Sequence, residues 1–179
     1  MKRNIFVFGL ISGGLAGLFL IALSSWEKNA DSQTGYLLGY ASMIVALSLI
    51  YVGVRNYRDK YNDGVISFGK AFQLAMGIAA IAATIYVLTW LVEFYVFMPD
   101  FMEKYAAREA AQARSAGLSA AALSEKLAEI DSMRTGYKNP VVVILYSYAE
   151  ILPVGIIISL ITALLLKRKR RPASTAAIA

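Results

Sequence analysis

The chain contains neither cysteine nor histidine. Without cysteine it has no disulfide, no thiol nucleophile and no thiolate metal ligand. Without histidine it has no imidazole ligand for zinc or haem and no Ser/His or Cys/His catalytic pair. We therefore predict no catalytic residues, no metal site and no cofactor, and we do not expect an enzyme.

Charged residues are scarce as well, at 17% of the 179 residues, whereas hydrophobic residues make up 58%. The mean hydropathy is +0.56, which is typical of an integral membrane protein rather than of a soluble domain. Four apolar runs have about the 20 residues that a helix needs to cross the hydrocarbon core. They cover residues 5–24, 36–54, 71–97 and 140–166.

These runs predict an all-α, polytopic fold with four transmembrane helices. They form a single membrane domain over residues 1–171, and we expect a disordered tail at 172–179. The first run is rich in glycine and longer than the apolar core of a secretory signal peptide, which is about 7–15 residues. We therefore interpret it as a retained helix.

The basic residues predict the orientation of the chain. Eleven Lys and Arg residues flank the runs on one side, and the other side carries Lys28 and six more in the long loop, where six acidic residues offset them. Cytoplasmic loops carry the excess of Lys and Arg, so both termini should lie in the cytoplasm, with the protein in a bacterial inner membrane.

A basic run follows the last apolar run directly. It consists of Lys167, Arg168, Lys169, Arg170 and Arg171. We interpret it as a topology anchor that attracts anionic lipid headgroups at the cytoplasmic face, and we expect no nucleic-acid partner. Lys70, at the start of the third run, is expected to extend its amine toward the headgroups.

The polar connection at residues 100–135 predicts a helical hairpin between the third and fourth spans. Two helices are separated by a break at Gly117, with Ser119 and Gly136 as caps of the second. Each helix has a short apolar edge, and the two edges should face each other. The hairpin is either a structural extension on the outer face or a docking arm for a membrane protein partner.

Small residues predict close packing between helices. Gly9, Gly13 and Gly17 repeat every four residues along the first span, and Gly155 lies in the fourth. Glycine removes the side chain and lets a neighbouring backbone approach, which is how helices associate in lipid. These faces serve packing within one chain or a contact between copies in a homo-oligomer.

Two carboxylates lie within apolar runs, where an ionisable group is costly. Glu150 is ten residues beyond Pro140, or about 15 Å along the helix, whereas Glu93 is near the end of its run and closer to water. Pro153 should kink the helix beside Glu150. Together with Tyr146 these residues form a candidate proton or cation site, the alternative being a carboxyl hydrogen-bonded to a hydroxyl for structure alone.

Three segments resemble a known family. They are Asp63-Gly64-Val65-Ile66-Ser67-Phe68-Gly69-Lys70-Ala71-Phe72, Tyr137-Lys138-Asn139-Pro140 and Glu150-Ile151-Leu152-Pro153-Val154-Gly155. The Tyr-Lys-Asn-Pro and Glu-x-x-Pro-x-Gly patterns are similar to those of uncharacterised four-helix bacterial inner-membrane proteins, a domain of unknown function. The resemblance implies a fold and a location and assigns no activity.

We therefore interpret the chain as a structural or accessory subunit that binds a partner through its hairpin or its small-residue faces. The alternative is a small proton- or cation-coupled carrier or channel that uses an intramembrane glutamate at a proline-kinked helix.

Overall fold

The computed structural model describes residues 1–26 and 32–168, and the regular structure in that part of the chain is helical. The helices are α1 (Lys2–Trp26), α2 (Ser32–Leu47), α3 (Leu49–Tyr61), α4 (Phe68–Val92), the π-helical turn η2 (Glu93–Phe97), α5 (Phe101–Ser115), α6 (Ala120–Gly136) and α7 (Pro140–Leu166). The all-helical prediction is confirmed for the described residues.

Four helical segments are long and apolar enough to cross a membrane. They are Lys2–Ser24, Thr34–Tyr61, Phe68–Phe97 and Pro140–Leu166. Each overlaps one of the four predicted runs, so the chain is a multi-pass membrane protein. The predicted tail at 172–179 lies outside the described residues.

The chain divides into two compact units. The first comprises Met1–Tyr86 and the chain from Ile151 onward, and the second comprises Val87–Glu150. Helices α4 and α7 are each divided between the two units.

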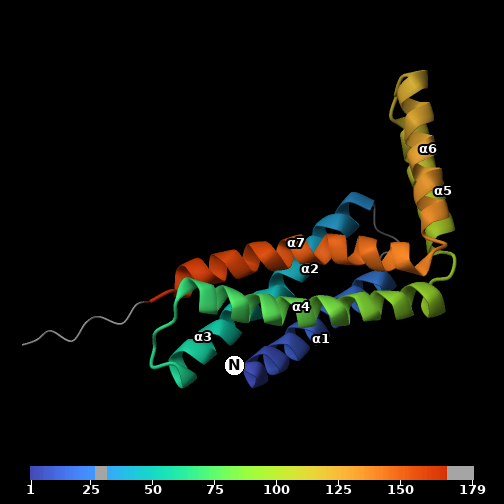
Figure 1. Ribbon diagram of the computed structural model, residues 1–179. Coiled ribbons are helices and arrows are strands. Elements are labelled where there is room, and N and C mark those ends of the chain that lie inside the picture. Colours follow the sequence, from blue (N-terminus) through green and yellow to red (C-terminus); the bar gives the residue numbers. More distant parts are fainter. Residues whose placement is uncertain (27–31, 169–179) are drawn as a thin grey trace, which may run out of the picture. The chain divides into compact units, whose positions relative to one another are not determined.

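In the first unit α1 packs beside α2 and α3 (Figure 1). Its core is apolar, with Leu47, Ile50, Leu74 and Ile78 fully buried. Burial of aliphatic side chains does not drive association in lipid as it does in water, so close contact and hydrogen bonds between helices must hold this unit together.

The second predicted span is interrupted at Ser48, where α2 ends and α3 begins. The Tyr51 amide donates to the Ser48 carbonyl, three residues back, instead of the usual four. The Ser48 hydroxyl donates to the Val45 carbonyl at 2.6 Å. The helix also continues to Tyr61, beyond the predicted end of the span at residue 54. Its last two turns are polar.

Two hydrogen bonds tie α1 to this interrupted span. The Ser12 hydroxyl donates to the Ala46 carbonyl at 2.7 Å, and the Asn4 amide donates to the Gly53 carbonyl at 2.5 Å. Both side chains are buried. The bonds therefore lie before and after the break and fix α1 against both halves of the span.

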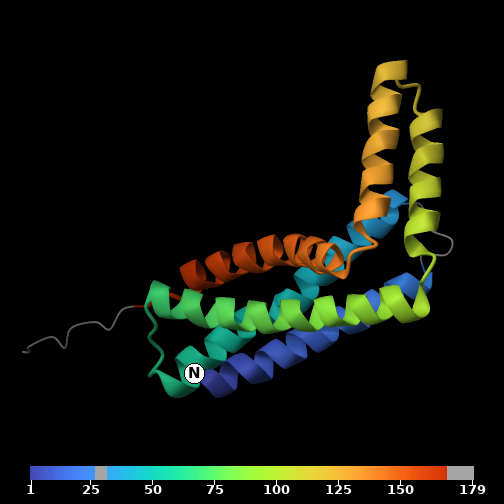
Figure 2. The ribbon, with the colours of Figure 1, turned by 45° about the vertical axis from the view of Figure 1, so that its right-hand side comes forward.

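In the second unit α5 and α6 pack side by side, joined by a turn (Figure 2). Met102, Ala106 and Ala113 of α5 and Ile130 of α6 are buried. Arg134 of α6 donates to Glu103 of α5 at 3.2 Å. We call these two helices the α5–α6 pair.

The turn between the two helices has the predicted chemistry at its start. Gly117 has φ +66°, a conformation that favours glycine, and the Ser119 hydroxyl accepts a hydrogen bond from the Ala122 amide as the N-cap of α6. The predicted C-cap is wrong. Gly136 is the last helical residue, and Tyr137 caps the helix, with its amide bonded to the Met133 carbonyl.

An aromatic cluster lies at the base of the α5–α6 pair. The Phe94 ring lies 6.1 Å from Phe101 and 5.8 Å from Tyr137, measured between ring centroids, and Trp90 lies 5.1 Å from Phe101. Phe94 is buried together with Val143 of α7. Within the second unit, the cluster packs the start of α5 and the end of α6 against the end of α4 and the start of α7.

Candidate functional site

Glu150 lies on the exposed side of α7. The helix starts at Pro140 and continues through Pro153, which has no amide hydrogen. The Ala149 carbonyl therefore loses the donor that would normally come from four residues ahead. A carboxyl and a backbone carbonyl that lacks its usual donor thus lie next to each other in the middle of an apolar helix.

Tyr146 lies one turn before Glu150, on the same side of α7. Its side chain is 50% exposed. Its ring stacks on Tyr137 with 5.6 Å between centroids and 27° between the planes. Stacking on Tyr137 restricts the orientation of the Tyr146 ring. Ser147, by contrast, is buried and donates to the Val143 carbonyl at 2.8 Å in its own helix.

Glu93 has different surroundings. It begins the π-helical turn, the Met98 amide donates to its carbonyl at 2.8 Å, and its side chain is only 8% exposed. The sequence placed Glu93 near the end of its run, and the structure shows that its side chain is covered by protein there. Glu93 is thus buried, whereas Glu150 lies on the exposed side of α7.

Metal binding needs several ligands in one place. Within residues 1–26 and 32–168, no group of three or more acidic side chains is gathered in a way that could hold a metal ion.

The glycines of α1 lie against α4. A Cβ atom at Gly9 would be 2.7 Å from Ile81 Cβ, and one at Gly13 would be 2.8 Å from Ile85 Cβ and 3.0 Å from Ala82 Cα. Gly155 of α7 similarly approaches Ala79, at 3.2 Å.

Gly17 is buried as well. The glycine face of α1 is thus covered within the first unit, which favours packing within one chain over a contact between copies at this face.

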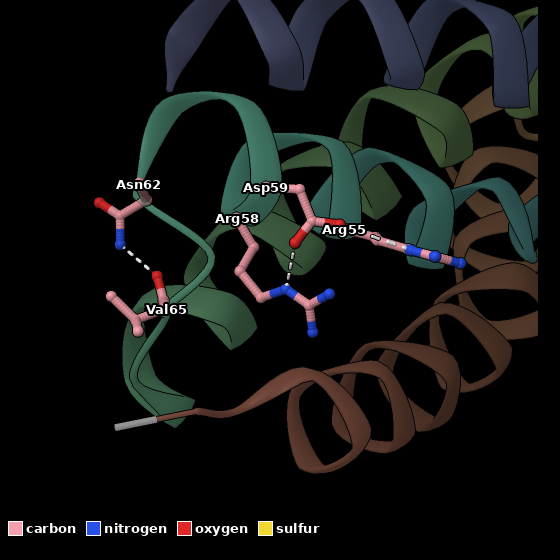
Figure 3. Close-up of polar contacts among 5 residues, drawn as sticks. All are labelled: Arg55, Arg58, Asp59, Asn62 and Val65. Atoms are coloured by element: carbon pink, nitrogen blue, oxygen red, sulfur yellow. Dashed lines mark hydrogen bonds and ion pairs between the residues drawn. The ribbon is translucent and has the colours of Figure 1, made fainter. Parts of the chain in front are cut away.

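The end of α3 carries a small ion-pair network (Figure 3). Asp59 lies 2.6 Å from the Arg58 Nε atom and 3.5 Å from the Arg55 Nε atom. The Asn62 amide donates to the Val65 carbonyl and closes the loop that leads to α4. One carboxylate between two guanidinium groups leaves a net positive charge at this end of the first unit.

Lys70 is held by the protein. Its amine donates to Asn62 Oδ1 at 3.0 Å and lies 5.3 Å from the centroid of the Tyr57 ring. The sequence predicted that this side chain extends toward the headgroups, and the structure shows its amine in contact with Asn62 and the Tyr57 ring. A hydrogen bond and a cation–π contact occupy the amine and position the 62–67 loop.

The basic run after α7 is described only for its first two residues, Lys167 and Arg168, and both are exposed. Lys169, Arg170 and Arg171 lie outside the described residues. Arg168 exchanges two backbone hydrogen bonds with Ile66, at 2.8 and 3.1 Å. This bridge places the start of the basic run beside the loop between α3 and α4.

Residues 7–168 match a family of proteins of unknown function, DUF4199. The chain belongs to this family. The match includes the segments that carry the sequence resemblance, and it attaches no activity to them. Comparisons with curated proteins and with solved structures found no match. For this member of DUF4199, function must therefore be argued from its own residues.

Sequence reasoning missed several of the residues that shape this member of the family. Ser12 and Asn4 bond backbone carbonyls of the second span, and Ser48 interrupts that span. A polar residue inside an apolar run is a signal that could have pointed to Ser12. The π turn at Glu93–Phe97 was missed because no proline or glycine lies within it.

Proposed function

We propose that the protein is an accessory subunit of the bacterial inner membrane, with both termini in the cytoplasm and no enzymatic activity of its own. It binds a membrane protein partner through the α5–α6 pair on the opposite side of the membrane. Anionic lipid headgroups contact the basic run that starts at Lys167. The asymmetric distribution of Lys and Arg supports this orientation.

The observation that carries the proposal is the construction of the α5–α6 pair. The pair buries its own apolar seam and is held by the Glu103–Arg134 ion pair and by the aromatic cluster at its base. It is thus an ordered polar element between two membrane-spanning helices. Ordering two helices costs conformational entropy. Because the pair is already ordered before a partner docks, that entropy is not lost again on binding.

The exposed surface of the pair offers a contact point at its turn. Leu118 is 44% exposed there, surrounded by exposed polar and small residues. A single apolar side chain within a polar surface fits a partner that binds through a small hydrophobic contact and a polar rim.

The alternative, a proton- or cation-coupled carrier or channel, requires Glu150 to face a path that water can reach. Glu150 lies on the exposed side of α7, whereas Glu93 is buried. This arrangement favours the accessory role over the carrier.

The test is purification in mild detergent with mass determination of the complex. We compare the wild type, a variant in which residues 100–135 are replaced by a short Gly/Ser linker, and the variant Leu118→Ser. The wild type should carry a defined partner at fixed stoichiometry, the deletion should lose it, and Leu118→Ser should weaken its binding with unchanged helix content.

A deletion variant that stays folded and retains the same partner would contradict the proposal. If Glu150→Gln abolished a pH-dependent flux while the deletion left that flux intact, the carrier would replace the accessory role.

A further inference from the structure

One end of the first unit gathers basic side chains from four segments. The start of α1 lies beside the end of α3 there (Figures 1 and 2), and the loop after α3 bonds both the start of α4 and the end of α7. The basic residues of these segments are Lys2, Arg3, Arg55, Arg58, Lys60, Lys70, Lys167 and Arg168, and the acidic ones are Asp59 and Asp63. This end of the unit therefore carries a net positive charge.

Arg3 is held by a tyrosine rather than by a carboxylate. Its Nη2 atom donates to the Tyr61 hydroxyl at 3.1 Å, and no carboxylate within residues 1–26 and 32–168 pairs with it. The Tyr61 ring is stacked in turn on Tyr57, with 6.2 Å between the centroids. A guanidinium has five N–H donors, so Arg3 keeps an unneutralised charge and most of its donors for a ligand.

A small cavity opens beside this pair. Met1, Arg3, Asn4 and Tyr61 line it, and its volume is about 50 Å³. One water needs about 10–15 Å³ by the same measure, so the cavity has room for a group of several heavy atoms. The Tyr61 hydroxyl accepts from Arg3 and still has its own proton to donate. A guanidinium and a hydroxyl at one cavity suit an oxyanion with several acceptor oxygens, such as a phosphate.

An apolar surface of α1 continues from this cavity into the membrane. Phe6, Val7 and Leu10 follow Arg3 by three, four and seven residues, so they lie on the same side of the helix. Their side chains are 59%, 44% and 56% exposed, and they belong to the apolar segment Lys2–Ser24. A ligand with a phosphate beside Arg3 thus has a hydrophobic surface next to it, which suits a phospholipid and not a free phosphate ion.

We propose that the cavity between Arg3 and Tyr61 binds the phosphate of an anionic phospholipid, whose acyl chains lie along Phe6, Val7 and Leu10. The guanidinium and the tyrosine hydroxyl donate to the phosphate oxygens. The positive charge around them favours a headgroup with a net negative charge over a zwitterionic one. The site is separate from the basic run that starts at Lys167. It depends neither on the orientation in the membrane nor on the partner proposed for the α5–α6 pair.

Native mass spectrometry in mild detergent tests the site by counting bound lipids. The purified full-length protein is titrated with phosphatidylglycerol, which is anionic, and with zwitterionic phosphatidylethanolamine that has the same acyl chains. The apparent dissociation constant of the first bound lipid should be severalfold lower for phosphatidylglycerol. Equal constants for the two lipids would overturn the proposal.

Substitutions at the cavity test which groups bind the phosphate. Arg3→Gln should raise the dissociation constant for phosphatidylglycerol about tenfold, because it removes charge-assisted hydrogen bonds. Tyr61→Phe should raise it by a smaller factor, since it keeps the ring that stacks on Tyr57. Both side chains are exposed, so we expect the variants to fold, and unchanged thermal unfolding midpoints check this.

Lys60→Gln is the matched control. It removes the same charge one residue from Tyr61, but Lys60 is exposed and does not line the cavity. Its dissociation constant should stay within about twofold of the wild type. If Arg3→Gln and Lys60→Gln weakened binding equally, the attraction would be a diffuse effect of charge and the proposed site would be wrong.

Water-soluble competitors separate a lipid site from a site for a free phosphate. The competitors are inorganic phosphate and glycerophosphoglycerol, which has the headgroup of phosphatidylglycerol without its acyl chains. At tenfold excess over the lipid, neither should displace the first bound phosphatidylglycerol. Displacement by either compound would contradict the lipid assignment, because the acyl chains would then contribute nothing to binding.

Discussion

At the scale of single residues, Gly13 and Gly14 are adjacent glycines with opposite surroundings. A Cβ atom at Gly13 would press against Ile85 Cβ and the Ala82 backbone, whereas one at Gly14 would meet no atom within 4 Å. Overpacking of this kind costs about 1–3 kcal/mol. We predict that Gly13→Ala lowers the thermal unfolding midpoint in detergent.

Gly14→Ala is the matched control. It should hold or raise the midpoint, because alanine favours a helix over glycine by up to about 1 kcal/mol. An equal loss of stability in the two variants would show that helix propensity, rather than contact with α4, decides the effect.

The sequence identified Glu93, Glu150 and the glycine repeat by chemistry and spacing alone. It could not tell which of the two carboxyls is buried, because the direction in which a residue points depends on the helices packed around it. Glu93 turned inward through the π turn, and Glu150 turned outward on α7. The sequence thus identified the two ionisable residues but not whether each is buried or exposed.

At the scale of helices, the contact between α1 and the interrupted second span depends on Ser12. Its hydroxyl is buried and bonded to the Ala46 carbonyl, two residues before the break at Ser48. Hydrogen bonds between membrane helices are worth about 0.6 kcal/mol on average and up to about 1.7 kcal/mol. We predict that Ser12→Ala lowers the unfolding free energy by an amount in this range, measured by denaturation in mixed micelles.

Ser42→Ala serves as its control. The Ser42 hydroxyl bonds the Gly39 carbonyl of its own helix at 2.7 Å, so its loss should leave the contact between helices intact. If Ser42→Ala were as harmful as Ser12→Ala, the bond between helices would have no special weight.

Helix positions were more predictable than helix interruptions. Apolar run length gave the four spans, and glycine and serine gave the turn and the N-cap of the α5–α6 pair. The break at Ser48 and the π turn at Glu93–Phe97 were missed because no proline or glycine lies within either of them. At Ser48 the hydroxyl bonds the Val45 carbonyl and the Ser48 carbonyl accepts from the Tyr51 amide, a local arrangement that a serine alone does not predict.

At the scale of the whole molecule, composition was sufficient to predict a multi-pass helical membrane protein, and the helices long enough to cross a membrane agree with it. The roles of individual surfaces were not predictable. The glycine face of α1 is packed within the chain, whereas Tyr146 and Glu150 lie on the exposed side of α7.

The orientation in the membrane decides on which side the α5–α6 pair meets its partner and on which side the basic residues lie. Two exposed positions report it in a chain without cysteine. Leu118 lies at the turn of the pair, and Lys60 lies near the end of α3.

The most direct test is labelling of Leu118→Cys and Lys60→Cys by a membrane-impermeant maleimide. In intact spheroplasts Leu118→Cys should be labelled and Lys60→Cys protected, and permeabilisation should expose Lys60→Cys. Labelling of Lys60→Cys in intact spheroplasts, with Leu118→Cys protected, would contradict the orientation and with it the proposed place of partner binding.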